Sequence, residues 1–308
     1  MKAKVIGAMA AAMIAAWIPS AARAGYVESI YWTQWSGYEG VYRANADGTG
    51  VQRIVSANLT SLDGLGIDHL NGKLYFTTAQ ELLRCNLDGS GLETVFTEQS
   101  GTCFDLAVEP GIGKVYWSHW DSDQGEGGIW RANLDGTSVE TVWSGKYMYG
   151  KAFDLSAGKL YWTAGLPEGA IYRSDLDGSN VEVVLEGTWK KGHLIAVALD
   201  LPNSKMYFAT WEEGGIWRAN LDGTGVEYLL DDQTASLALD PYGGKLYWPS
   251  WVLGTDAIKR CDLDGNGQEV VCLMGGSGNS IALEIVPEPA TLSMLALGGL
   301  ALLRRRKK

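Results

Sequence analysis

Residues 159–178 read KLYWTAGLPEGAIYRSDLDG, and this stretch decides the fold. It joins an aromatic pair, Tyr161-Trp162, to the segment Arg173-Ser-Asp175-Leu-Asp177-Gly. An Asp-Gly pair between two apolar runs is a strong hairpin signal, because glycine accepts the positive φ of a tight turn. The stretch therefore predicts two antiparallel strands and a tight turn into a third.

The same unit occurs six times along the chain. The aromatic pairs, 40–46 residues apart, begin at Tyr31, Tyr75, Tyr116, Tyr161, Tyr207 and Tyr247. The Asp-Gly pairs begin in phase at Asp47, Asp88, Asp135, Asp177, Asp222 and Asp264. An acid lies seven residues before each aromatic pair after the first, at Asp68, Glu109, Asp154, Asp200 and Asp240, and Glu284 is a sixth near the end.

Each unit reads as four short strands, and four strands at this period are typical of a β-propeller blade. The chain enters on a second strand, residues 29–33, and leaves on an orphan first strand, residues 280–285. The last strand can therefore complete the first blade and remove two open sheet edges. We predict an all-β, six-bladed β-propeller over residues 25–286, with four antiparallel strands per blade and a ring closed by its N- and C-terminal strands.

The repeats, with Tyr-Trp-Thr at residues 31–33 and 161–163, resemble the YWTD class of six-bladed propellers typified by the LDL-receptor family. The resemblance covers about 260 residues and implies the same fold. No copy has Asp after the aromatic triplet; the fourth positions are Gln34, Thr78, His119, Ala164, Thr210 and Ser250.

The two ends read as targeting segments. Residues 1–24 combine two early lysines, an apolar run and a small-residue end at Ala22-Arg23-Ala24, which predicts a secretory signal peptide and export. Residues 287–308 contain Pro287-Glu288-Pro289, an apolar run over residues 290–303 and five bases. This order resembles the PEP-CTERM sorting signal of Gram-negative bacteria.

That resemblance implies processing by an exosortase-type enzyme, transient membrane retention through the C-terminal segment, and a destination in the cell envelope or outside the cell. The other interpretation is a plain C-terminal anchor. Fourteen apolar residues are few for it, since a spanning helix needs about 20.

Charge excludes one class of partner. Residues 25–286 hold 35 acids against 17 lysines and arginines, which would repel nucleic-acid phosphates. A hydrophobic content of 46% with 13 tryptophans also excludes a disordered chain.

Features present in all six copies are interpreted as structure. The Arg and Asp-Gly sets are expected to make turn hydrogen bonds and Arg–carboxylate pairs between blades. At the mouth of the axial channel, the residues four before each acid are Gly64, Asp105, Gly150, Ala196, Ser236 and Ser280. One carboxylate among five small residues is no metal cage, so we predict no metal, cofactor or catalytic residue.

The symmetry breaks at a second tryptophan, four residues after the Tyr in four copies: Trp35, Trp120, Trp211 and Trp251. With His119, Asp121 and Glu212 nearby, these indoles form a predicted ligand-binding rim, since Trp faces with carboxylates suit sugar rings or cationic peptide side chains. The alternative is that the indoles pack between blades.

The sequence thus predicts an exported, non-catalytic binding module for a protein or polysaccharide ligand. An exported lyase or lactone hydrolase with His119 or Asp105 at the channel mouth is the alternative, and a purely structural matrix protein is a third. A deep polar axial pocket with two or more converging titratable groups would favour the enzyme, and indoles exposed over a broad rim would favour the binder.

Four cysteines in an exported chain leave two possibilities. Local disulfides would join Cys85 to Cys103 and Cys261 to Cys272, or all four are free buried thiols.

Overall fold

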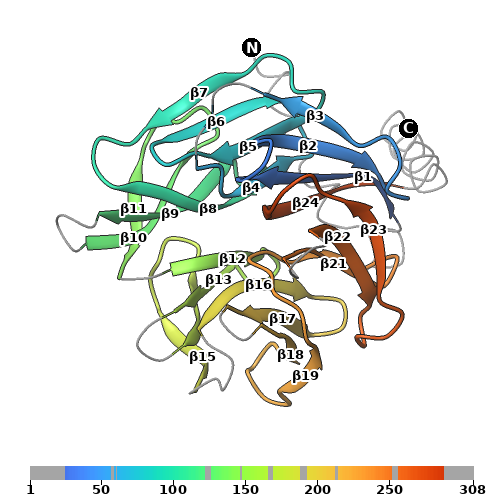
Figure 1. Ribbon diagram of the computed structural model, residues 1–308. Helices are drawn as coiled ribbons and strands as arrows, with labels where there is room; N and C mark the ends of the chain where they lie inside the picture. Colours follow the sequence, from blue (N-terminus) through green and yellow to red (C-terminus); the bar gives the residue numbers. More distant parts are fainter. Residues whose placement is uncertain are drawn as a thin grey trace, which may run out of the picture.

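The computed structural model describes residues 25–56, 59, 61–121, 126–145, 148–165, 169–187, 193–211, 214–251 and 256–287. These residues form six four-stranded antiparallel sheets arranged as the blades of a propeller (Figure 1). The predicted all-β, six-bladed fold is therefore confirmed. The predicted signal peptide and most of the predicted sorting segment, including Glu288 and Pro289, lie outside the described residues.

The strands follow one another from the axis outward in each blade. The first three blades consist of β24(Gly278–Pro287), β1(Gly25–Gln34), β2(Gly40–Asn45) and β3(Gln52–Val55); β4(Leu65–Asp68), β5(Lys73–Thr77), β6(Glu81–Asn86) and β7(Glu93–Thr97); and β8(Thr102–Glu109), β9(Lys114–Asp121), β10(Glu126–Asn133) and β11(Glu140–Ser144). The last three consist of β12(Met148–Asp154), β13(Lys159–Ala164), β14(Ala170–Asp175) and β15(Glu182–Glu186); β16(Leu194–Asp200), β17(Lys205–Thr210), β18(Ile216–Asn220) and β19(Glu227–Leu230); and β20(Ala238–Asp240), β21(Lys245–Ser250), β22(Ala257–Asp262) and β23(Glu269–Leu273).

The ring closes as the sequence predicts. β24 pairs antiparallel with β1, and Ala282 lies opposite Tyr31 while Ile281 lies opposite Trp32 (Figure 1). The strand is longer than expected and ends at Pro287, opposite Gly25, so it runs into the sorting motif. Two open edges disappear on closure, which removes the pairing sites that exposed strands offer to other chains.

The aromatic pairs fill the space between blades. Trp32, Trp117, Trp162 and Trp248 are fully buried, as are the tyrosines that precede the first three of them. Successive strand residues point to opposite faces of a sheet, so each pair serves the two interfaces of its blade. Trp32 lies in one apolar cluster with Ile258, for example, and Tyr31 lies in another with Leu74.

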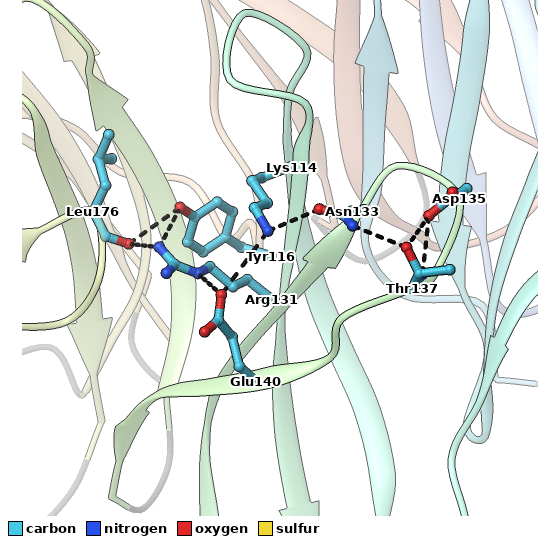
Figure 2. Close-up of polar contacts among 8 residues, drawn as sticks. All are labelled: Lys114, Tyr116, Arg131, Asn133, Asp135, Thr137, Glu140 and Leu176. Atoms are coloured by element: carbon cyan, nitrogen blue, oxygen red, sulfur yellow. Dashed lines mark hydrogen bonds and ion pairs between the residues drawn. The ribbon is translucent and has the colours of Figure 1, made fainter.

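A set of polar contacts recurs at the outer part of the blades, and Figure 2 shows the copy in the third. Its Arg–Glu pair occurs in the second to sixth blades, whereas Arg43 of the first blade donates to Ser29 Oγ. Asp135 Oδ1 accepts hydrogen bonds from the Thr137 amide at 3.0 Å and from its hydroxyl at 2.6 Å, which confirms the predicted turn bonding. Arg131 Nη1 donates to the Leu176 carbonyl of the next blade at 2.6 Å. Its Nε pairs with Glu140 at 2.7 Å.

The expected Arg–carboxylate pairs between blades are therefore wrong in one respect. The carboxylate belongs to the fourth strand of the same blade, directly opposite the arginine, and a carbonyl oxygen provides the contact between blades. A carbonyl next to the Asp-Gly turn of the next blade accepts a hydrogen bond from Arg84, Arg131, Arg218 and Arg260.

Two features of the Asp-Gly turn require glycine at its second position. Gly178 has a φ of +85°, which side chains rarely adopt, and a Cβ there would overlap the carbonyl oxygen of Val142 in the preceding blade. The turn therefore also determines how closely adjacent blades approach.

The proposed disulfides do not form. Cys85, Cys103, Cys261 and Cys272 are all free and buried. The register explains one pair, because Cys272 lies opposite Ile258 rather than Cys261. Burial raises the pKa of the Cys85, Cys103 and Cys261 thiols to about 12, so these thiols are poor nucleophiles.

The described part of the chain contains no helix that is long and apolar enough to span a bilayer. The apolar run at residues 290–303 lies outside that part.

Candidate functional site

A cavity of about 400 Å³ lies at the mouth of the axial channel, where the innermost strands begin. Each of the six blades contributes to its lining. The contributing residues lie five positions before the repeated acid: Asp63, Phe104, Tyr149, Ile195, Ala235 and Asn279. These equivalent positions carry six different side chains, whereas the rest of the blade repeats, so the mouth is where the six copies differ most.

β-Bulges direct these residues toward the channel. The pairing of β8 with β9 shifts register between Cys103 and Leu106, and that of β12 with β13 shifts between Met148 and Lys151. A bulge turns two consecutive side chains away from simple alternation and is common beside functional sites. Phe104 and Asp105 lie within the first shift, and both line the cavity.

A smaller cavity of about 180 Å³ continues the channel below the mouth. It is surrounded by the residues three before each acid: Leu65, Leu106, Lys151, Val197, Leu237 and Ile281. Five of the six are aliphatic, so Lys151 alone interrupts an apolar ring.

Lys151 is a buried cation with three partners. Its side chain is 0% exposed, and its Nζ lies 2.8 Å from Asp105 Oδ2. The ammonium also donates to Ser118 Oγ at 2.7 Å and to the Tyr149 carbonyl at 3.0 Å. Burial lowers the pKa of Lys151, and the carboxylates of Asp105 and Asp63 oppose that shift. Asp105 is 22% exposed, so this ion pair forms the floor between the two cavities.

Asp63 supplies the second carboxyl of the mouth. Its backbone is fixed on both sides, because its amide donates to the Thr77 carbonyl at 3.1 Å and its carbonyl accepts from Thr33 Oγ1 at 2.7 Å. Burial and the Asp105 charge raise the pKa of Asp63 to about 7, against the opposing effects of Lys151 and a hydrogen bond from Asn279. At neutral pH this carboxyl can therefore both donate and accept hydrogen bonds.

Aromatic rings form the other wall. Tyr149 stacks on His193 with ring centroids 5.9 Å apart, and both line the cavity with Phe104. Trp211 is 37% exposed at the same opening, and Trp251 packs edge-on against it at 4.8 Å. Trp251 Nε1 donates to the Gly278 carbonyl, which fixes this pair of indoles. The mouth thus combines carboxyl, amide and hydroxyl groups with aromatic faces.

The structure places the four tryptophans of the predicted rim in different surroundings. Trp211 and Trp251 lie together at the mouth, so they are packed between blades and partly open to a ligand at once. Trp35 is 47% exposed on the rim, and Trp120 is half-buried over Gly127. Neither of these lines the cavity. Glu212 lies outside the described residues.

The two polar rim residues in the third blade are buried. His119 stacks on Trp130 with centroids 4.5 Å apart, and its Nδ1 lies 3.1 Å from Glu98 Oε2. Asp121 is likewise buried. Neither His119 nor Asp121 lines the cavity, so these two residues are not part of the cavity site.

Sequence reasoning missed Asp63, Asn279 and Lys151. It considered only the positions four before the acid, which include Asp105, whereas Asp63 and Asn279 lie five before the acid and Lys151 lies three before it. The available signal for Lys151 was a single lysine in a column of aliphatic residues. Among the described residues, no group of three or more His, Cys, Asp or Glu side chains is placed to hold a metal ion.

Known proteins resemble both the propeller and the C-terminal segment of this chain. Residues 286–307 match the PEP-CTERM protein-sorting motif, which implies export and sorting to the envelope. The human low-density lipoprotein receptor-related protein 5-like protein is 27% identical over 139 residues, or 43% of this chain. The match spans about half, 52%, of that relative.

Two solved structures show the same fold. A chain of the nidogen/laminin complex superposes with a TM-score of 0.71 and 18% identity, covering 83% of this chain and 97% of that one. A gluconolactonase from Xanthomonas campestris superposes with a TM-score of 0.56 and 16% identity, covering 75% and 84%. The chain is thus a six-bladed β-propeller with sequence similarity to LDL-receptor-related proteins. At its C-terminal end it carries a PEP-CTERM sorting motif.

Proposed function

We propose that this exported propeller is a binding module that receives a sugar ring of a polysaccharide at the axial mouth. The observation that carries the proposal is the convergence of six unlike residues, one from each blade, on a single cavity. Its volume of about 400 Å³ lies within the range of small-ligand sites. A ligand of this size contacts the mouth rather than a broad outer rim.

The chemistry of the lining supports a sugar. Trp211 and Tyr149 offer flat aromatic faces to the apolar face of a ring. The carboxyl of Asp63, the amide of Asn279 and the hydroxyl of Ser236 can form hydrogen bonds with the sugar hydroxyls. At a pH near its pKa, the Asp63 carboxyl can donate as well as accept these hydrogen bonds. The acidic body of the chain argues against a polyanionic polymer, so we expect a neutral or amino-sugar residue.

The test is a glycan array screened with the full chain and two matched variants. Trp211→Ala removes an indole that lines the cavity, and Trp35→Ala removes an indole of similar exposure outside it. We expect Trp211→Ala to weaken binding at least about fivefold while Trp35→Ala binds as the wild type does. If both variants lost glycan binding equally, the binding site would lie on the outer rim instead. Binding to peptides but not to glycans would show that the ligand is a protein.

A second candidate is the exported enzyme. The axial channel meets the criterion that favours an enzyme, because the titratable groups of Asp63, Asp105 and Lys151 converge there. A carboxyl with a pKa near 7 also suits general acid–base catalysis at neutral pH. The test is turnover of lactones and uronate polysaccharides by wild type and Asp63→Asn. A true general acid or base would make Asp63→Asn about 100-fold or more slower. If the wild type binds a ligand but turns over none of these substrates, the enzyme is excluded and the binding module is retained.

A further inference from the structure

The face of the ring opposite the mouth carries a set of exposed apolar side chains. On this face, which we call the turn face, the first strand turns into the second in the second to sixth blades, at residues 69–72, 110–113, 155–158, 201–204 and 241–244. Leu70 is 72% exposed at the tip of its turn, and Ile112, Leu155 and Tyr242 are between 41% and 44% exposed at theirs. Tyr26, at the start of β1, adds a fifth exposed large side chain on the same face.

The turns that carry these apolar side chains, which we call the tips, are fixed by hydrogen bonds and contain no charged residue. The acid before the turn accepts hydrogen bonds from the turn's backbone. Asp68 Oδ1 accepts one from the Leu70 amide at 3.0 Å, and Asp240 Oδ1 accepts one from the Tyr242 amide at 3.1 Å. Asp68, Asp154, Asp200 and Asp240 are all buried. The turns themselves contain no Asp, Glu, Lys or Arg. Single exposed apolar residues are ordinary on a protein surface, but here one lies in the equivalent turn of each of four repeats.

The chain leaves the propeller on this same face. β24 ends at Pro287, paired with Gly25, and the apolar run begins three residues later at Ala290. Three residues reach at most about 10 Å when extended. An apolar segment retained in a bilayer therefore keeps the turn face, and not the mouth, within about 10 Å of the lipid.

We propose that the turn face rests on the membrane that holds the C-terminal segment, with Leu70, Ile112, Leu155 and Tyr242 entering the lipid headgroup region. Leucine and aromatic side chains at a rigid surface are the groups that partition into this zone. The proposal goes beyond the ligand site, because it concerns the opposite face and holds whatever the mouth binds.

Charge on the same face indicates which lipid it accepts. The exposed carboxylates of the six Asp-Gly turns lie at its periphery: Asp47, Asp88, Asp135, Asp177, Asp222 and Asp264. These groups oppose anionic headgroups, so the contact requires zwitterionic lipid. The docked molecule would then present its mouth away from the membrane.

The experiment uses the full chain with its C-terminal segment, reconstituted in phosphatidylcholine vesicles that contain a headgroup-quencher lipid. Ala157→Cys places a fluorophore in an exposed turn beside Leu155, and Tyr38→Cys places one near the mouth. The four native thiols are buried and do not compete for the label. We expect the label at residue 157 to be quenched several-fold more than the label at residue 38.

A variant pair separates docking from simple tethering. In the background labelled at residue 157, Leu70→Ser, Ile112→Ser and Tyr242→Ser remove three tips. The control, Val183→Ser, Val270→Ser and Leu273→Ser, removes equally exposed apolar side chains from the outer strands. The first set should reduce quenching at least about twofold and the control should not. Replacing half of the lipid with phosphatidylglycerol should reduce it as well.

Three results would overturn the proposal. The first is equal quenching at residues 38 and 157, and the second is unchanged quenching in the triple tip variant with a wild-type unfolding temperature. The third is quenching at residue 157 that rises with the number of chains per vesicle, because a second copy of the chain would then cover the turn face.

Discussion

Asp63 shows how much a single side chain of this propeller depends on its surroundings. Burial and the Asp105 carboxylate raise its pKa to about 7, while Lys151 and Asn279 act in the opposite direction. The exposed Asp47 has the reverse behaviour, because hydrogen bonds from Thr49 lower its pKa. The two aspartates therefore respond to pH with opposite signs.

The first prediction concerns Asp63→Asn and the pH dependence of stability. The folded state binds the Asp63 proton more tightly than the unfolded chain, whose Asp titrates near pH 4. The contribution of Asp63 to stability is therefore complete below about pH 4 and is lost as the pH rises toward about 7. The unfolding temperature of the wild type should fall relative to that of Asp63→Asn across this interval.

Asp47→Asn is the matched control for that measurement. Its folded pKa is lowered, so its contribution is present at neutral pH and is lost as the pH falls through the acidic range. Parallel curves for wild type and Asp63→Asn from pH 4 to 8 would contradict a raised pKa for the Asp63 carboxyl.

The second prediction concerns Lys151→Met. The change removes a buried cation and leaves Asp105 without its ion partner, which costs about 3 kcal/mol for a buried pair. Urea unfolding should show the full loss at pH 8 and a smaller one at pH 5, where Asp63 is protonated and no longer repels Asp105. Adding Asp105→Asn should recover most of the loss, and failure of this rescue would mean that Lys151 acts through packing alone.

At the scale of the strand and turn, the same residues determine both local conformation and contact between blades. The Asp135 turn is closed by its own hydrogen bonds to Thr137, and the arginine of the adjoining strand reaches across to the next blade. Gly178 has a positive φ and lies against the Val142 carbonyl of its neighbour. A change at such a turn therefore acts on two blades.

The third prediction compares Gly178→Ala with Gly158→Ala. Both glycines have positive φ, +85° and +67°, but a Cβ at Gly158 would meet no atom within 4 Å. Gly158→Ala should cost about 1 kcal/mol from backbone strain alone. Gly178→Ala should cost about 2 kcal/mol more because it also forces the blades apart. Chemical denaturation measures both, and equal costs would show that the turn makes no steric contact between blades.

At the scale of the whole molecule, stability depends on closure. β24 supplies the innermost strand of the first blade, and Ile281 and Leu283 lie in one apolar cluster with Ile30 and Trp32 of β1. Removing β24 would therefore expose a core cluster and reopen two sheet edges.

The fourth prediction follows from this closure. Deleting residues 278–308 should abolish the cooperative thermal transition, whereas deleting residues 288–308 should leave it unchanged, since every strand within the described residues ends by Pro287. Differential scanning calorimetry distinguishes the two. A cooperative transition in the larger deletion would mean that five complete blades and a partial one form a stable arc.

The architecture is accessible from the sequence because it is repeated: six Asp-Gly turns, six arginines and an orphan strand are enough to predict the ring. The ligand site is accessible only in part. The residue pattern points to Asp105 and Trp211, but Asp63 and Asn279 occupy an equivalent position at which the residue type differs in every copy. The bulges that turn Asp105 and Lys151 into the channel have no signature in residue type. Burial of His119 also depends on Glu98 and Trp130, which are distant in sequence.

The position of β24 in the chain has a consequence for biogenesis. Of the strands within the described residues, the innermost strand of the first blade is the last to be synthesised and the last to cross a secretion channel. Until it emerges, β1 has no inner neighbour, so the nascent propeller passes through export as an unfinished arc that needs protection from self-association. Release from the channel and completion of the tertiary structure are thereby coupled in time.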